Sequence, residues 1–259
     1  MNGKEAVILS RSLSGCSAIA ALALLALLAL MGCAHAETPR EHALSMLTRG
    51  QTRAAIAELE ALRDAAPSDP QRWIDLGHAY ELDHRYDEAL GAYDRAASVA
   101  PDRPEGPREG GLRAASWGEW ALAKVRLEEA VRRGDDDPAT FHALGLVLLQ
   151  LGDRDGAERA YERGLATPMG DRDATCVLGL ATLAVAREDA AAALRWYDEL
   201  ARRRPGAPGA QFGRAWALGT LRRWEEAERA LDEAASLGGG ASDVERLRAW
   251  LRERRASAS

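Results

Sequence analysis

The residues best suited to metal binding or nucleophilic chemistry in this 259-residue chain are its histidines and cysteines. The histidines are His35, His42, His78, His84 and His142. They form neither a helical pair four residues apart nor the Cys/His spacing of a zinc site. The chain also has no G-x-S-x-G, P-loop or G-x-G-x-x-G sequence. We therefore expect no metal, no cofactor and no catalytic residue, which makes the chain a non-enzyme.

The first cysteines belong to a segment with the features of an export signal. Lys4 and Arg11 precede an apolar run from Ala18 to Met31, whose 14 residues fit a secretory signal. A membrane-spanning helix needs roughly 20 apolar residues. Residues 1–32 are therefore predicted to be a signal peptide.

The end of this run, Leu30-Met31-Gly32-Cys33, resembles the lipobox of bacterial lipoproteins. The resemblance implies that Cys33 is lipidated and becomes the new N-terminus, with 33–39 as a short linker. The expected location is the cell envelope, at the outer membrane and facing the periplasm. The competing prediction is cleavage after Ala36, at an A-x-A site, which would release a soluble periplasmic protein.

Cleavage at Cys33 leaves Cys176 as the one cysteine of the mature domain. A single thiol cannot form an internal disulfide, so we expect Cys176 to be a small buried residue. Cleavage removes Lys4, Glu5 and Arg11, which changes the net charge from -6 to -7. This charge argues against nucleic acid or an anionic membrane surface as the main partner.

A repeat of 34 residues organises the rest of the chain. Alanine recurs at Ala55, Ala89, Ala123 and Ala157, and again at Ala193 and Ala227 after one longer step. Six units follow, at 36–69, 70–103, 104–137, 138–173, 174–207 and 208–241. The second unit has Trp73, Leu76, Gly77, Tyr80, Ala89, Tyr93, Ala96 and Pro101, and it resembles the tetratricopeptide repeat. The resemblance implies an all-α, right-handed superhelical solenoid of helix-turn-helix units.

Packing requirements explain the recurring positions. Small residues on the first helix of each unit, Ala43, Gly77, Gly111, Gly145, Ala181 and Ala215, allow the second helix to approach closely. Glycines such as Gly50, Gly118 and Gly152 are predicted to adopt the left-handed conformation between the two helices. After the sixth unit, 242–259 is predicted to be a capping helix and tail, which begins with a capping box formed by Ser242 and Glu245.

The repeat phase also predicts a binding surface. In tetratricopeptide arrays the concave wall is formed by first-helix residues that face away from the second helix. The corresponding positions are Arg40, Leu44, Leu47, Ile74, His78, Glu81, Arg108, Leu112, His142, Leu146, Leu149, Leu178, Thr182, Phe212 and Trp216. This wall is mostly apolar and suits a peptide or an amphipathic helix of a protein partner. The alternative is that the end helix, or a second subunit, covers it.

The predicted function is a non-enzymatic scaffold or adaptor for protein-protein interaction, tethered to the cell envelope. The architecture is similar to that of the pilotin lipoproteins of type IV pilus biogenesis, and to that of the tight-adherence pilus lipoproteins. Those families imply a role in pilus or secretin assembly. The alternative is a periplasmic accessory regulator that docks a cell-wall hydrolase or protease.

Overall fold

The computed structural model describes residues 37–170 and 174–258, which form thirteen α-helices and no strand. The predicted signal peptide, Cys33 and Ala36 lie outside the described residues. The helices are α2 (Pro39–Thr48), α3 (Thr52–Ala65), α4 (Pro70–Leu82), α5 (Tyr86–Val99), α6 (Glu105–Ser116), α7 (Trp120–Arg132), α8 (Pro138–Gln150), α9 (Arg154–Leu165), α10 (Thr175–Ala186), α11 (Ala190–Arg203), α12 (Pro208–Thr220), α13 (Trp224–Ser236) and α14 (Ala241–Ser257).

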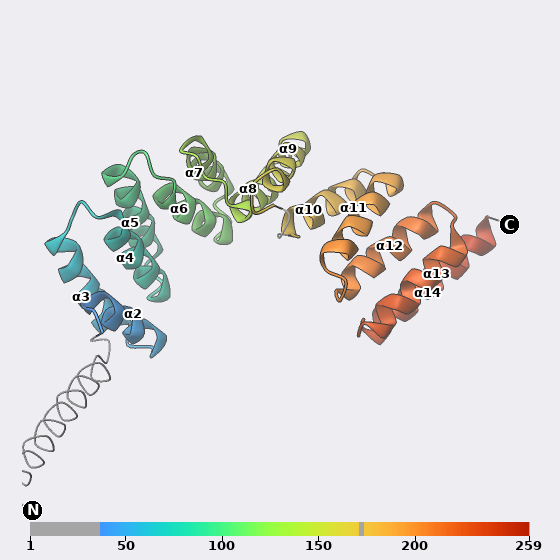
Figure 1. Cartoon of the computed structure of the whole chain (residues 1–259), viewed down its shortest axis with the longest axis horizontal. Helices are drawn as coiled ribbons and strands as arrows, with labels where there is room; N and C mark the ends of the chain where they lie inside the picture. Colours follow the sequence, from blue (N-terminus) through green and yellow to red (C-terminus); the bar gives the residue numbers. More distant parts are fainter. Residues whose placement is uncertain (1–36, 171–173, 259) are drawn as a thin grey trace, which may run out of the picture. The chain divides into compact units, whose positions relative to one another are not determined.

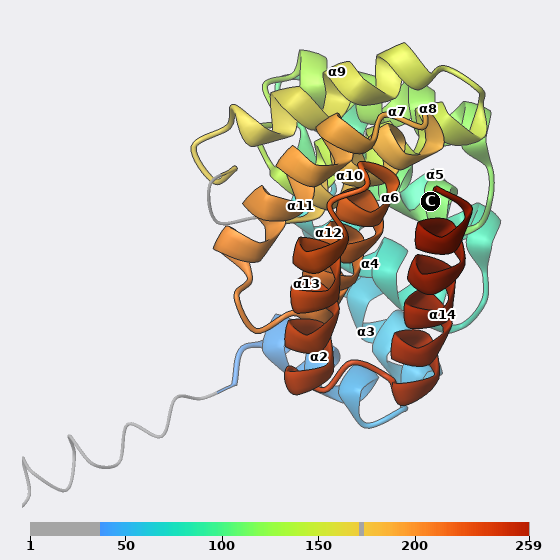
Figure 2. The same ribbon diagram turned by 90° about the vertical axis from the view of Figure 1, so that its right-hand side faces the viewer.

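The chain divides into two compact units, Met1–Glu58 and Leu59–Ser259. The first contains α2 and the start of α3. In the second, α4 to α13 follow one another as five antiparallel pairs (Figure 1). We call the first member of each pair the A helix and the second the B helix. Helix α14 lies against α12 and α13 (Figure 2). The prediction of an all-α solenoid of helix pairs is confirmed.

The recurring alanines mark the closest contacts between helices. All six, from Ala55 to Ala227, have no exposed surface. The large residue four positions later on the B helix is also fully buried in four of the five pairs of the second unit, as Tyr93, Leu127, Tyr161 and Leu231. A small and a large buried residue thus recur four positions apart on these B helices and fill the space between the paired helices.

The buried tyrosines occupy spaces that glycines leave open. A Cβ atom on Gly77 would lie 2.6 Å from Tyr93 Cε1. Tyr161 is enclosed by Gly145 of its own pair and by Gly179 of the next, where an added Cβ would lie 2.6 Å from its ring. One tyrosine therefore connects two successive repeats, and any larger residue at these glycines would push the helices apart.

The turn between the A and B helices is left-handed in every pair. Gly50, Gly118 and Gly152 have φ of 74°, 81° and 83°, as the sequence predicts. The same position is occupied by His84, Glu188 and Arg222, with φ of 59°, 59° and 60°. A left-handed conformation costs a residue with a Cβ about 1–3 kcal/mol, so the repeat geometry overrides local preference at these three turns.

The start of the end helix differs from the prediction. Helix α14 begins at Ala241 with Gly240 as its N-cap, and no side chain caps it. The predicted capping box of Ser242 and Glu245 is therefore wrong, because the backbone turns into the helix earlier and Val244 N already donates to Gly240 O at 3.0 Å. A capping box does occur in α2, where the Thr38 side chain accepts from Glu41 N.

The single cysteine of the described residues, Cys176, is fully buried on α10, as predicted. Asp137 caps α8 by accepting a hydrogen bond from Ala139 N at 2.9 Å. Within residues 37–170 and 174–258, no helix has the length and apolar character needed to cross a membrane.

A pair of glycine substitutions in the second repeat tests the packing account. We expect Gly77→Ala to destabilise the chain by about 1–3 kcal/mol, because the buried Tyr93 ring has no space to move into. The matched change Gly91→Ala, at an exposed α5 position with nothing within 4 Å, should stabilise it by about 0.5–1 kcal/mol. Urea unfolding measures both, and equal effects would contradict the close contact.

Candidate protein-binding face

The predicted wall residues lie on one side of the A helices, which we call the A-face. On α8, His142, Leu146 and Leu149 follow one another at spacings of four and three residues and so share one side of the helix. Leu146, Leu178 and Thr182 are exposed, and the other predicted residues of the second unit are half-buried, except for Ile74. Ile74 is only 5% exposed; it belongs to the interior, and its prediction as a wall residue is wrong. Leu44 and Leu47 belong to the first unit, where they are half-buried.

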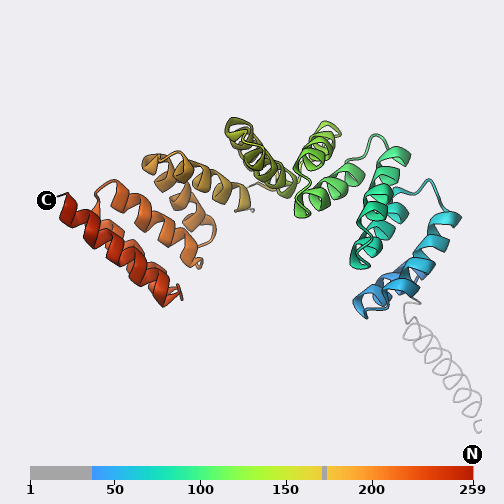
Figure 3. The same ribbon diagram turned by 180° about the vertical axis from the view of Figure 1, so that it is seen from behind.

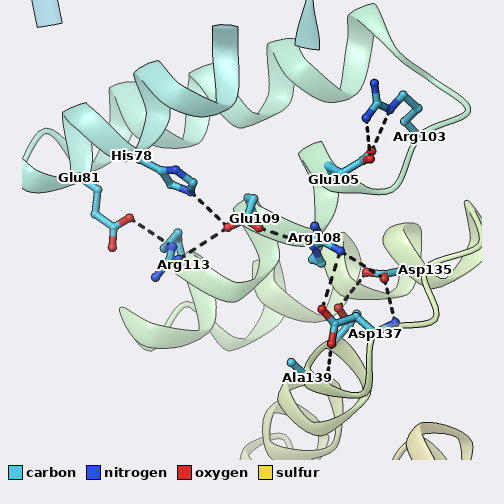
Figure 4. Close-up of polar contacts among 11 residues, drawn as sticks. His78, Glu81, Arg103, Glu105, Arg108, Glu109, Arg113, Asp135, Asp137 and Ala139 are labelled. Carbon is cyan, nitrogen blue, oxygen red and sulfur yellow. Dashed lines mark hydrogen bonds and ion pairs between the residues drawn. The ribbon is translucent and has the colours of Figure 1, made fainter. Parts of the chain in front are cut away.

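On α4 and α6 the A-face is charged. His78 Nε2 lies 3.3 Å from Glu109 Oε2, and Glu81 Oε2 lies 3.2 Å from Arg113 Nε. Arg113 also lies within 3.6 Å of Glu109, so the two helices are joined by one network of alternating charges (Figure 4). Glu109 was not predicted, because it contacts His78 only through the stacking of neighbouring repeats.

The network continues through Arg108 to the loop before α8. Arg108 Nη1 lies 3.6 Å from Asp135 Oδ1 and 3.9 Å from Asp137 Oδ2. The Asp135 side chain is 3% exposed, and it accepts hydrogen bonds from Thr140 Oγ1 at 2.8 Å and from Asp137 N at 3.1 Å. A buried carboxylate is stable only with such partners, so Asp135 fixes the loop that joins α7 to α8.

These contacts shift the ionisation of Glu109. The hydrogen bond with His78, followed by the positive charges of Arg108 and Arg113, lowers the pKa of Glu109 below 4.5 despite its partial burial. Burial acts in the opposite sense on the tyrosines below the A-face, and it raises the pKa of Tyr161 to about 12. Glu109 is therefore ionised at neutral pH and Tyr161 is not.

On α8 and α10 the A-face is apolar and open. Leu146 and Leu178 are 44% and 46% exposed, whereas the neighbouring leucines Leu144 and Leu148 of α8, and Leu180 and Leu183 of α10, are buried. His142 lies over the buried Tyr161, with ring centroids 5.9 Å apart. The A-face thus has two halves, a charged one on α4 and α6 and an apolar one from α8 onward, which the expectation of a mostly apolar wall did not separate.

The apolar half ends at a hollow between α12 and α14. Trp216 lines a space of about 350 Å³ together with Leu247, Trp250, Asp243 and Arg246. Leu247 and Trp250 were not predicted as wall residues. The signal was present in the sequence, because Trp250 follows Trp216 by one period of 34 residues. The end helix therefore extends the A-face and leaves Leu146 and Leu178 uncovered.

The side chains of this face offer both polar and apolar contacts. Among the described residues, no group of three or more histidine, cysteine, aspartate or glutamate side chains is placed to hold a metal ion. The charged half offers ion pairs and hydrogen bonds, and the apolar half offers leucine and tryptophan surface. Such a combination selects a partner that carries matching polar and apolar regions.

A stack of helix pairs with an extended open face is a repeat scaffold for protein-protein interaction, a class that binds peptides or protein partners. A family model described as tetratricopeptide repeat matches residues 40–107, 142–208 and 178–243, together more than half of the chain. The chain belongs to the tetratricopeptide repeat family. The fold is one of non-catalytic interaction scaffolds.

Solved structures of this fold include PilF, PilW and YrrB. PilF of Pseudomonas aeruginosa is 19% identical, with a TM-score of 0.63, and the match covers 82% of this chain and 96% of that one. PilW, described as a widely conserved type IV pilus biogenesis factor, is 14% identical with a TM-score of 0.63, over 81% and 96% of the two chains. YrrB, a tetratricopeptide protein with an unusual peptide-binding site, is 17% identical with a TM-score of 0.61, over 73% and 97%. No curated protein sequence matches the chain.

The lowered pKa of Glu109 predicts a pH dependence of stability. Because the folded state favours the carboxylate, its contribution is complete above the ordinary value of 4.5 and is lost as the pH falls through the lower folded value. Glu109→Gln should therefore flatten the fall in melting temperature between about pH 5 and pH 3. Glu162→Gln, on an exposed part of α9, is the control. An unchanged acid slope in Glu109→Gln would contradict the assigned network.

Proposed function

We propose that this protein is a non-catalytic scaffold tethered to the bacterial cell envelope, which binds an apolar segment of another envelope protein along the A-face of α8, α10, α12 and α14. The observations that carry the proposal are the exposure of Leu146 on α8 and of Leu178 on α10, and the hollow that Trp216 and Trp250 line on α12 and α14. Apolar side chains that could have been polar at no cost to the repeat packing are typical of a binding surface.

The two halves of the A-face favour an amphipathic helix as the bound segment. Its apolar side would lie on Leu146, Leu178 and Trp216, in the way that helices bind in hydrophobic grooves. The charged half on α4 and α6 would set its orientation, because charge complementarity fixes register more than it adds affinity.

A pilus role is supported by two independent observations. PilF and PilW share this fold over nearly their whole length. The sequence Leu30-Met31-Gly32-Cys33 resembles a lipobox, which would place the scaffold at the outer membrane, facing the periplasm. We propose that the partner is a component of a pilus or of the secretin ring through which a pilus passes.

Photo-crosslinking in the native organism tests the binding face. A photoreactive residue at Leu178 should crosslink to a pilus or secretin protein, whereas one at Arg222, on a turn, should not. Leu146→Asp should reduce the crosslink at least tenfold, because a charge on the apolar face must be desolvated on binding. Should the crosslink persist in Leu146→Asp while the fold is intact, the apolar half of the A-face is not the binding site.

The anchor has a separate test. Cys33→Ser should leave the protein without lipid and move it from the membrane fraction to the soluble periplasmic fraction, because acyl chains contribute about 0.8 kcal/mol per buried methylene. Labelling with a radioactive fatty acid measures the lipid directly. A Cys33→Ser protein that still carries label, or that still sediments with membranes, would contradict lipidation at this cysteine.

A further inference from the structure

A second cleft lies on the side of the B helices, between α7 and α9. It has a volume of about 510 Å³, which is within the range of ligand sites in proteins. Phe141, Leu144 and Leu148 of α8 contribute apolar surface, and Val125 of α7 lies at its edge. Figures 1 and 3 show α7 and α9 on either side of α8. Val125 is 60% exposed, the highest value among the large apolar residues exposed in the described chain.

The repeat phase explains why this cleft is open. One position of the B helix, which faces the preceding B helix, is occupied by Arg126 on α7, Ala160 on α9 and Trp196 on α11. Arg126 is 12% exposed and reaches Asp94 of α5 at 2.7 Å, and Trp196 packs against the buried core. Ala160 has one side-chain carbon, so the space that a large residue occupies in the neighbouring repeats is empty here.

The next opening of this kind is already occupied by ion pairs. Ala230 on α13 also leaves a space, but Arg214 crosses it and lies 2.6 Å from Asp198 and 3.7 Å from Glu233. Among the described residues, no ion pair crosses the cleft between α7 and α9. No ion pair therefore closes this cleft, at whose floor Phe141, Leu144 and Leu148 are 4–6% exposed.

Arginine side chains outnumber carboxylates among the residues that line the cleft. Arg159 and Arg163 lie four residues apart on α9 and form no ion pair with any described residue; Arg163 Cζ lies 5.1 Å from the centre of the Phe141 ring. The other lining charges have partners: Arg132 pairs with Glu129, Glu128 lies 3.8 Å from Lys124, and Asp153 accepts a hydrogen bond from Gly156 N at 2.7 Å. Two guanidinium groups are thus available in a chain with a net charge of -6.

We propose that the cleft between α7 and α9 binds an acidic amphipathic segment of a protein, separately from the A-face. Apolar side chains of the segment fill the space beside Ala160 and rest on Phe141, Leu144 and Leu148. Its carboxylates pair with Arg159 and Arg163, because guanidinium groups bind carboxylates through two parallel hydrogen bonds. The presence of Glu128 and Asp153 disfavours nucleic acid, whose phosphates need a continuous basic surface. With two faces, one scaffold can hold two partners.

Fluorescence anisotropy with two synthetic peptides tests the proposal. The first is a helix-forming peptide with leucines at every third or fourth position and glutamates between them. The second has lysine in place of every glutamate. The full chain should bind the acidic peptide at least tenfold more tightly than the basic one, and added salt should weaken the binding. Equal affinities, or no binding of the acidic peptide, would overturn the proposal.

Substitutions locate the bound peptide. Ala160→Trp, which copies Trp196, should abolish binding. Val125→Glu should weaken peptide binding at least tenfold, and Val125→Lys should not. Because Val125 is exposed, these two variants test the cleft even if Ala160→Trp fails to fold. Leu178→Asp, on the A-face, should leave the affinity unchanged. If Leu178→Asp abolishes binding and the cleft variants do not, the peptide occupies the A-face and the proposal for the cleft is wrong. If the chain binds the acidic peptide but a photoreactive residue at Leu178 captures no partner, the proposal for the A-face is wrong and the proposal for the cleft stands.

Discussion

The close approach of each A helix to its B helix is the constraint on which the rest of the structure depends. It requires a small residue on one helix wherever the other carries a large one. Tyr161 shows the constraint most clearly, because Gly145 and Gly179 leave no room for a Cβ beside its ring. Since Gly179 belongs to the next repeat, the same contact that closes one helix pair also sets the distance to its neighbour. The stack is therefore built by repeating one local interaction.

Because the packing between helices constrains only part of each repeat, two other sets of positions can vary. The first set lies on the A-face, where side chains point away from the B helix. It includes the charged network of His78, Glu81 and Glu109 at one end and exposed leucines at the other. On the side of the B helices, Ala160 replaces a space-filling residue and opens a cleft. Function in this fold thus depends on where the repeat pattern permits variation, whereas the fold depends on where it does not.

The sequence alone predicted most of the fold, because a 34-residue period fixes which residues must be small, buried or left-handed. It placed Gly50, Gly118 and Gly152 in the turns and Cys176 in the core. It did not predict that His84, Glu188 and Arg222 adopt the same left-handed conformation, since their local preference is against it. The capping box at Ser242 failed for a similar reason, because backbone geometry at Gly240 starts the helix earlier than side-chain chemistry indicates.

The candidate site was harder to predict. The period assigns positions to the A-face, but burial there depends on neighbouring repeats, and Ile74 proved to be interior. Glu109 contacts His78 of the preceding repeat, and Asp135 lies beside Arg108 of α6, contacts that a helix-by-helix interpretation does not detect. Trp250 could have been found by extending the period one step beyond the sixth unit. The sequence thus predicts which residues lie on the A-face, but it does not predict the contacts between repeats.

The central claim is that the A-face is the main binding surface. Hydrogen exchange of the purified chain tests it, measured with and without the partner segment that photo-crosslinking at position 178 identifies. We expect slower amide exchange in α8, α10, α12 and α14 when the segment is bound, with exchange in α5 and α11 unchanged. Slower exchange confined to the B helices would contradict it.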